Sequence, residues 1–174
     1  MQTIDMLGGP ETENMIRADV VIGGDTVRVL SIHLKSYQFN EGDYASINSG
    51  LAQSRGVAGK MKSTFHIRAM QADIVSAEIS GSPYPVIVAG DLNAIPVSHT
   101  YQTVRGNLQD AFLKTGFGFG RTFSSLAPTL RIDYILPDER FRYWTSTFTA
   151  ASVSNTFLLS QRLTLSTKNI CCCG

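Results

Sequence analysis

The sequence predicts an α/β (α+β) domain in which helices pack on a sheet. β-Branched segments alternate in polarity with period two, one long segment has apolar residues at helical spacing, and the two kinds alternate along the chain. With 174 residues the chain is long enough to bury one sizeable core, and no linker-like stretch divides it. We therefore expect residues 1–174 to form a single domain.

The first elements are predicted to be a hairpin. Residues 18–34, ADVVIGGDTVRVLSIHL, contain two β-branched runs joined by the turn-forming cluster Gly23-Gly24-Asp25. Alternation in the second run places His33 on one face of the sheet, and both faces are expected to be partly covered. The residues on the face opposite His33 are Leu30, Ile32 and Leu34.

A helix and two more strands follow. Residues 40–59 are polar, which favours a loop or a short helix, and residues 60–80 are predicted to form a helix that lies on the sheet. Its two expected apolar stripes are Met61, Phe65, Ala72, Val75 and Ile79, and Met70, Ile74 and Ala77. The segments 86–90, VIVAG, and 131–136, RIDYIL, are predicted to be strands.

Polar residues end the VIVAG strand. If the backbone stays extended, Asp91 and Asn93 project from the same face, where a carboxylate takes a proton from water and an amide orients it. Gly90 lets a backbone or ligand approach closely, and Pro96 stops the strand. The structural alternative is an Asx turn in which Asp91 caps the residues that follow. Spacing alone leaves both interpretations open.

His33 and Asp133 are polar residues within otherwise apolar strands. Taken alone, a strand histidine is commonly a satisfied core residue, and Asp133 is commonly paired, with Arg131 as the nearest cation in sequence. Together with Asp91 they favour a shared site. Arg68 is expected to bridge helix and sheet, and Asp110 to cap a helix or pair locally. The aromatic residues show no spaced basic and aromatic pattern typical of single-strand nucleic-acid binding.

The sequence resembles the endonuclease/exonuclease/phosphatase superfamily, which includes deoxyribonuclease I-like nucleases, sphingomyelinases and inositol-phosphate phosphatases. The resemblance covers about residues 18–141. The segments that carry it, in order, are SIHL, HIRAMQADIV, PVIVAGDLNAIPVSHTY, LQDAF and RIDYIL. It implies a partial four-layer β-sandwich flanked by helices, with a deoxyribonuclease I-like fold, and phosphoester hydrolysis assisted by Mg²⁺ or Mn²⁺.

The resemblance also implies catalytic roles for four residues. Asp91 would activate or orient the attacking water, Asn93 would position that water and the phosphate, and both would contribute to the metal site. His33 would donate a hydrogen bond to a phosphate oxygen. Asp133 would orient a histidine further along the chain.

Both ends of the chain depart from the family pattern. The family's Ser-Asp-His motif near the C-terminus is not found, and no histidine follows Asp133. The strand with a metal-binding glutamate that precedes the hairpin in the family also has no counterpart, and we assign no role to Glu11 or Glu13. We expect a truncated N-terminus and a divergent C-terminus, the latter explained by a reading-frame change near Val153. Activity is expected to be weak or lost.

The net charge of the chain and its lack of long apolar runs favour some binding partners over others. A net charge of +1 provides no broad positive field for nucleic acid, so a small phosphoester or a phospholipid headgroup is favoured over nucleic acid. We expect a soluble chain, because no apolar run is long enough to span a bilayer and no signal peptide is recognised, but localisation is not predicted. The adjacent Cys171, Cys172 and Cys173 exclude a disulfide framework.

Three functional classes therefore stay open. The first is a metal-dependent phosphodiesterase or phosphatase, the second an inactive remnant or binding module, and the third a nuclease. If strands are missing, an open sheet edge is expected to favour self-association.

Overall fold

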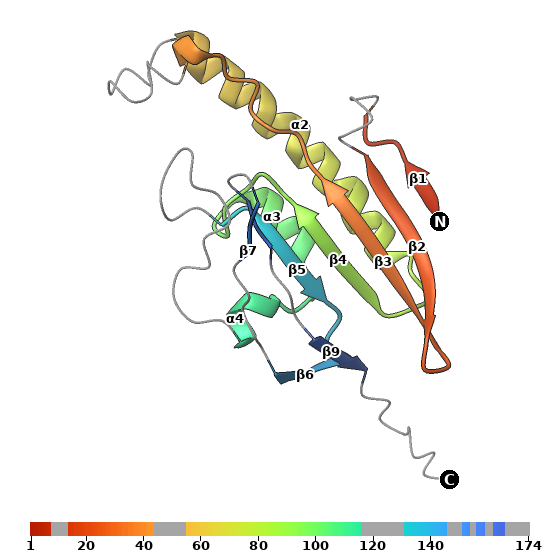
Figure 1. Cartoon of the computed structure of the whole chain (residues 1–174). Helices are drawn as coiled ribbons and strands as arrows, with labels where there is room; N and C mark the ends of the chain where they lie inside the picture. Colours follow the sequence, from red (N-terminus) through yellow and green to blue (C-terminus); the bar gives the residue numbers. More distant parts are fainter. Residues whose placement is uncertain are drawn as a thin grey trace.

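A five-stranded mixed sheet lies at the centre of the computed structural model (Figure 1). The structure describes residues 1–7, 14–43, 55–115, 131–145, 151–153, 156–158 and 162–165. The strands, in spatial order, are β1 (Gln2–Ile4), β2 (Met15–Ile22), β3 (Asp25–His33), β4 (Val86–Asp91) and β5 (Asp133–Pro137). Strands β3 and β4 run parallel, and the other neighbouring pairs are antiparallel.

The hairpin predicted from residues 18–34 is confirmed. Strands β2 and β3 pair from Met15 opposite Ile32 to Ile22 opposite Asp25. Gly23 and Gly24 form the turn with φ of 62° and 94°, a left-handed conformation that glycine adopts without a steric penalty.

Helix α2 (Arg55–Ser80) connects the parallel strands β3 and β4 and lies along one face of the sheet (Figure 1). The predicted helix is confirmed, but it begins five residues earlier than expected. The predicted apolar stripes are partly wrong, because Phe65 and Met70 are 48% and 42% exposed. Polar residues share the buried face in their place, and the buried positions are Val57, Thr64, Arg68, Gln71, Ala72 and Val75.

The structure describes two further helices, which are short. Helix α3 (His99–Arg105) packs against α2, and α4 (Ala111–Thr115) lies beside β5. Ser98 caps α3 by accepting a hydrogen bond from the Tyr101 amide. The core lies between the sheet and helices α2 and α3, and its fully buried side chains include Met15, Leu30, Leu34, Val75, Val88, Leu92 and Leu136.

Four shorter strands form two separate ladders. Strand β6 (Phe141–Thr145) pairs with β9 (Arg162–Leu165), and β7 (Ala151–Val153) pairs with β8 (Thr156–Leu158). A mixed sheet with helices on one face confirms the predicted α/β class. The prediction of one domain over residues 1–174 stays a prediction.

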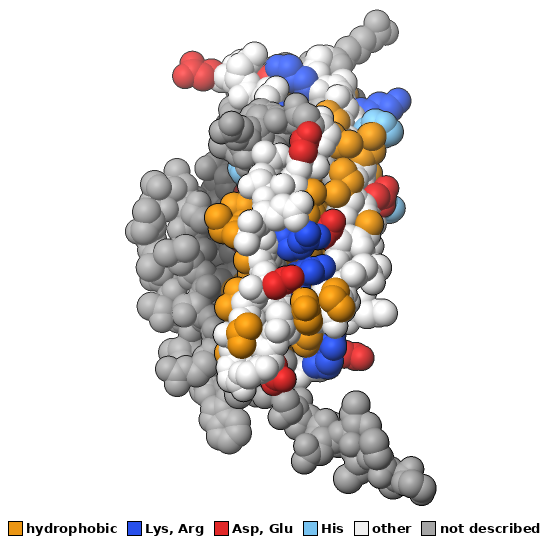
Figure 2. Space-filling view, turned by 90° about the vertical axis from the view of Figure 1, so that its right-hand side faces the viewer, with side chains coloured by type: hydrophobic (Ala, Val, Ile, Leu, Met, Phe, Trp, Pro, Cys, Tyr) orange, Lys and Arg blue, Asp and Glu red, His pale blue; other side chains and the backbone are white. Residues whose placement is uncertain are grey.

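Strand β2 has an open edge over part of its length. Strand β1 pairs only with Met15–Arg17, and no other described strand pairs with the same edge of β2 at residues 18–22. Val21 and Ile22 are 70% and 52% exposed at this edge. Figure 2 views the side of the molecule that carries β1 and β2, and hydrophobic side chains lie there among charged ones. The self-association predicted for an open edge has a specific location here, and it stays a prediction.

Among the described residues, no helix combines the length and apolarity needed to cross a membrane.

Candidate functional site

The register of three neighbouring strands brings three of the predicted site residues into one row. His33, the last residue of β3, lies opposite Asp91, the last residue of β4. Asp91 in turn lies opposite Asp133, the first residue of β5. Side chains at paired positions project from the same face of a sheet, with strands about 5 Å apart, so the row spans about 10 Å. This is the sheet face that points away from α2.

The row has an unusual charge distribution. Two carboxylates are neighbours, and burial together with the negative charge of Asp133 raises the pKa of Asp91 to about 6. A hydrogen bond from the Asn93 amide and the positive charges of His33 and Arg68 act in the opposite direction. Asp91 is therefore a carboxylate that exchanges a proton near neutral pH, as a general base requires.

Asn93 is close to Asp91 but does not continue the strand. Strand β4 ends at Asp91, and Asn93 has a φ of 48°, so the prediction that both side chains project from one extended strand is wrong. The reason is an Asx turn, in which the Asn93 amide donates to Asp91 Oδ1 at 2.7 Å. Asn93 Nδ2 donates to the Leu34 carbonyl at 2.9 Å, which anchors the side chain next to the end of β3. The Asx turn that was the alternative to a functional role is therefore present, and it holds Asp91 and Asn93 together.

Gly90 allows β3 and β4 to meet at the site. Its φ is 141°, and a Cβ at this position would lie 1.9 Å from the Ile32 carbonyl oxygen. Every other residue type carries that atom, so only glycine fits opposite Ile32 without displacing a strand. The sequence predicted that a backbone or a ligand approaches Gly90 closely, and in the structure it is the backbone of Ile32 that does so.

Two buried polar residues of α2 support the end of the sheet. Arg68, which is 1% exposed, donates from Nη1 to the Asn93 carbonyl, as predicted for a residue that bridges helix and sheet. Gln71 Oε1 accepts a hydrogen bond from the Lys35 amide at 2.8 Å. Both contacts fix main-chain groups that follow a site strand, and sequence spacing gave no sign that Asn93 was the partner of Arg68.

The expected pairing of Asp133 with Arg131 is wrong, because Arg131 binds a different carboxylate. Arg131 makes two hydrogen bonds of 2.8 Å to the carboxylate of Asp110, and both residues are buried. Asp110 also accepts from the Tyr101 hydroxyl at 2.6 Å and caps α4 through its Oδ1, which confirms the predicted capping role. Burial raises the pKa of Asp110, but the bonds from Arg131 and Tyr101 outweigh it, so the pKa lies below its usual value. Tyr101 is thereby held in the core.

The donor set suits a hard cation only in part. The Asp91 carboxylate and the Asn93 amide supply oxygen atoms, the ligand type that Mg²⁺ and Mn²⁺ prefer. However, the described residues contain no group of three or more His, Cys, Asp or Glu side chains able to hold a metal ion. A cation at Asp91 and Asn93 would therefore keep most of its ligands as water.

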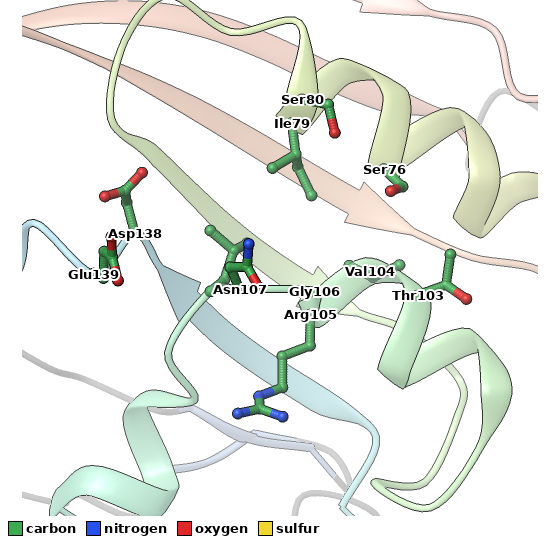
Figure 3. A pocket seen from close by; sticks show the side chains of 11 residues that line it. Ser76, Ile79, Ser80, Thr103, Val104, Arg105, Gly106, Asn107, Asp138 and Glu139 are labelled. Atoms are coloured by element: carbon green, nitrogen blue, oxygen red, sulfur yellow. The ribbon is translucent and has the colours of Figure 1, made fainter.

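A separate hollow of about 360 Å³ lies at the other end of the sheet (Figure 3). It is formed by the C-terminal ends of α2 and α3 and by the turn after β5, where Asp138 and Glu139 lie. Its lining includes Ser76, Ser80, Arg105 and Asn107, and none of the four predicted site residues. Cys171, Cys172 and Cys173 and the expected divergent C-terminus beyond residue 165 lie outside the described residues.

Comparison of the sequence with known protein families finds a match. The sequence model of the endonuclease/exonuclease/phosphatase family matches residues 9–154, and the chain belongs to that family. The resemblance inferred from the sequence motifs is therefore confirmed. A search of curated proteins finds no significant match.

Solved structures with the same fold are distant in sequence. A mannosyl-6-phosphatase from Bacteroides thetaiotaomicron is 17% identical, with a TM-score of 0.56 over 82% of this chain and 53% of its own. A humanized TDP2 of D. rerio is 18% identical, with a TM-score of 0.53 over 79% and 50%. A functionally unknown conserved protein from Enterococcus faecalis is 16% identical, with a TM-score of 0.53 over 81% and 51%. These similarities support the fold, and the chain spans about half the length of these solved chains.

Proposed function

We propose that the chain is a divalent-metal-dependent phosphoester hydrolase, a phosphodiesterase or phosphatase, whose catalytic residues are His33, Asp91, Asn93 and Asp133. The observation that carries this proposal is the row of His33, Asp91 and Asp133 across three adjacent strands, with Asn93 bonded to Asp91. Family membership supports the reaction class.

Each of the four residues has a separate role in the proposed reaction. Asp91, at the end of β4, activates or orients the attacking water. Asn93, fixed by its bond to the Leu34 carbonyl, orients that water and a phosphate oxygen. His33 donates a hydrogen bond to a phosphate oxygen, and Asp133 orients a neighbouring donor. Asp91 and Asn93, together with water, would hold Mg²⁺ or Mn²⁺, which would neutralise part of the phosphate charge.

The proposed substrate is a small phosphoester or the headgroup of a phospholipid. A net charge of +1 supports this choice over nucleic acid, whose binding depends on many positive contacts to phosphates. DNA affinity that falls steeply with added salt would instead favour the nuclease alternative.

Hydrolysis of bis(p-nitrophenyl) phosphate tests the proposal. We expect p-nitrophenol release to depend on Mg²⁺ or Mn²⁺ and to be lost in Asp91→Ala. Asp25→Ala is the matched control, because Asp25 is exposed at the opposite end of β3 from His33. An unchanged rate in Asp91→Ala would refute the catalytic role.

An inactive remnant is the second candidate. One observation favours it, which is that the described residues contain no group of three or more His, Cys, Asp or Glu side chains able to hold a metal ion. Losing one preorganised group in an active site commonly costs about 3–4 kcal/mol of transition-state stabilisation. A cooperative melt without any metal-dependent turnover would identify this case.

A further inference from the structure

An aromatic cluster lies beside the candidate site. Tyr37 and Phe39, in the segment after β3, stack with ring centroids 4.9 Å apart and planes at 2°. Phe65 of α2 meets the Tyr37 ring edge to face at 5.9 Å. Figure 1 shows the chain leaving β3 and running beside the first half of α2, beyond the end of the sheet. The cluster joins residues far apart in sequence, so spacing along the chain did not reveal it.

Arg68 connects this cluster to Asp91. Its guanidinium lies 4.4 Å from the Tyr37 ring centroid and 5.4 Å from that of Phe65. The same guanidinium donates to the carbonyl of Asn93, whose amide donates to Asp91. Arg68 therefore lies between the aromatic rings and Asn93, which is itself bonded to Asp91.

One ring of the cluster is exposed. Tyr37 and Phe39 are partly buried, as expected for a segment held against a helix, but Phe65 is 48% exposed. Arg68 is almost fully buried, and its Nε and Nη2 have no hydrogen-bond partner in the described part of the chain. An exposed aromatic ring above a buried positive charge is a surface suited to planar, electron-rich groups.

We propose that the exposed ring of Phe65, held in place by the stacked rings of Tyr37 and Phe39, forms a platform that binds the planar aromatic part of a small phosphoester, such as the base of a mononucleotide, while its phosphate lies at the row of His33, Asp91 and Asp133. This platform rests on the proposed function, because the phosphate is held by the site described above. It adds a substrate class to that function.

Binding of two ligands tests the platform. AMP and ribose 5-phosphate carry the same phosphate and sugar and differ in the base, and their affinities are measured by calorimetry with Ca²⁺ in place of Mg²⁺. Stacking of a base on an aromatic side chain strengthens binding by at least about fivefold, so the wild-type chain is expected to prefer AMP by that factor. Phe65→Ala is expected to remove the preference and to leave ribose 5-phosphate binding unchanged. Met70→Ala is the control, because Met70 is 42% exposed on the same helix and outside the cluster.

The outcomes separate the platform from the site. Preference for AMP in the wild type and in Met70→Ala, with none in Phe65→Ala, supports the platform. Equal binding of both ligands by the wild type overturns the platform and leaves the phosphate site standing. No binding of either ligand overturns both proposals. Thermal melts of each variant check that the exposed positions were changed without unfolding the chain.

Discussion

Replacing Asp91 by Asn is expected to stabilise the protein at neutral pH while it removes hydrolysis. The native state disfavours ionisation of Asp91, because burial and the neighbouring Asp133 raise its pKa from 3.8 to about 6. Asparagine has nearly the same shape, carries no charge, and retains an oxygen that accepts the Asn93 amide at 2.7 Å. The substitution therefore removes a destabilising charge and preserves the Asx turn.

The size of the effect follows from the pKa. A rise of about two units corresponds to about 3 kcal/mol as an upper limit, since each unit corresponds to about 1.4 kcal/mol. Asp91 is only partly buried, so solvent screening lowers the expected gain to about 1–2 kcal/mol. The folded state binds this proton more tightly than the unfolded state. The gain is therefore absent below about pH 4, grows between about pH 4 and 6, and is complete above about pH 6.

Urea unfolding in EDTA measures this difference at pH 4, 5, 6 and 7.5. Other carboxyls with lowered pKa values, such as Asp110 and Asp138, add their own pH dependence, so the quantity compared is Asp91→Asn minus wild type. In thermal melts, 1–2 kcal/mol corresponds to a rise of about 2–8 °C in Tm. Asp25→Asn, at the exposed start of β3, is the control. A variant that is less stable than wild type at pH 7.5, or a difference that does not change with pH, would refute the reasoning.

Three further predictions concern the parts that hold the site. Gly90→Ala is expected to destabilise the fold by about 3 kcal/mol or more, measured by urea unfolding, because its Cβ would lie 1.9 Å from the Ile32 oxygen. Arg131→Met is expected to cost about 3–5 kcal/mol by leaving Asp110 buried and unpaired, and adding Asp110→Asn should recover part of that loss. Val21→Lys is expected to lower any concentration-dependent association seen by light scattering, because Val21 is 70% exposed at the open edge of β2; unchanged association would place the contact elsewhere.

The strands of the site were predictable because they obey a simple period. Alternation placed His33 on the face opposite Leu30, and the same pattern assigned Asp133 to a strand of its own. The structure confirms both strands and adds the register, which no single-strand pattern contains. Register depends on pairing between distant segments, so the row of three residues became visible only in the fold.

The wrong expectations have a shared physical cause, which is that tertiary contacts override local patterns. Asn93 leaves the extended conformation because the Asp91 carboxylate captures its amide. Phe65 lies at an apolar helical position but is 48% exposed, whereas Arg68 and Gln71 occupy the buried face and bind main-chain groups. Arg131 pairs with Asp110 and not with its sequence neighbour, because only the fold brings those two charges together.

The described residues hold the proposed catalytic groups in position, but they do not fully compensate the negative charge of Asp91 and Asp133. Gly90 allows close strand contact, and Arg68 and the Asx turn hold Asn93, so the proposed catalytic groups have fixed places. Burial and the neighbouring carboxylate of Asp133 nevertheless raise the pKa of Asp91, although His33 and Arg68 act against that shift. A bound divalent cation would stabilise the ionised form of both carboxylates. The negative charge that disfavours ionisation of Asp91 is therefore the feature that would favour binding of the proposed metal ion at this end of the sheet.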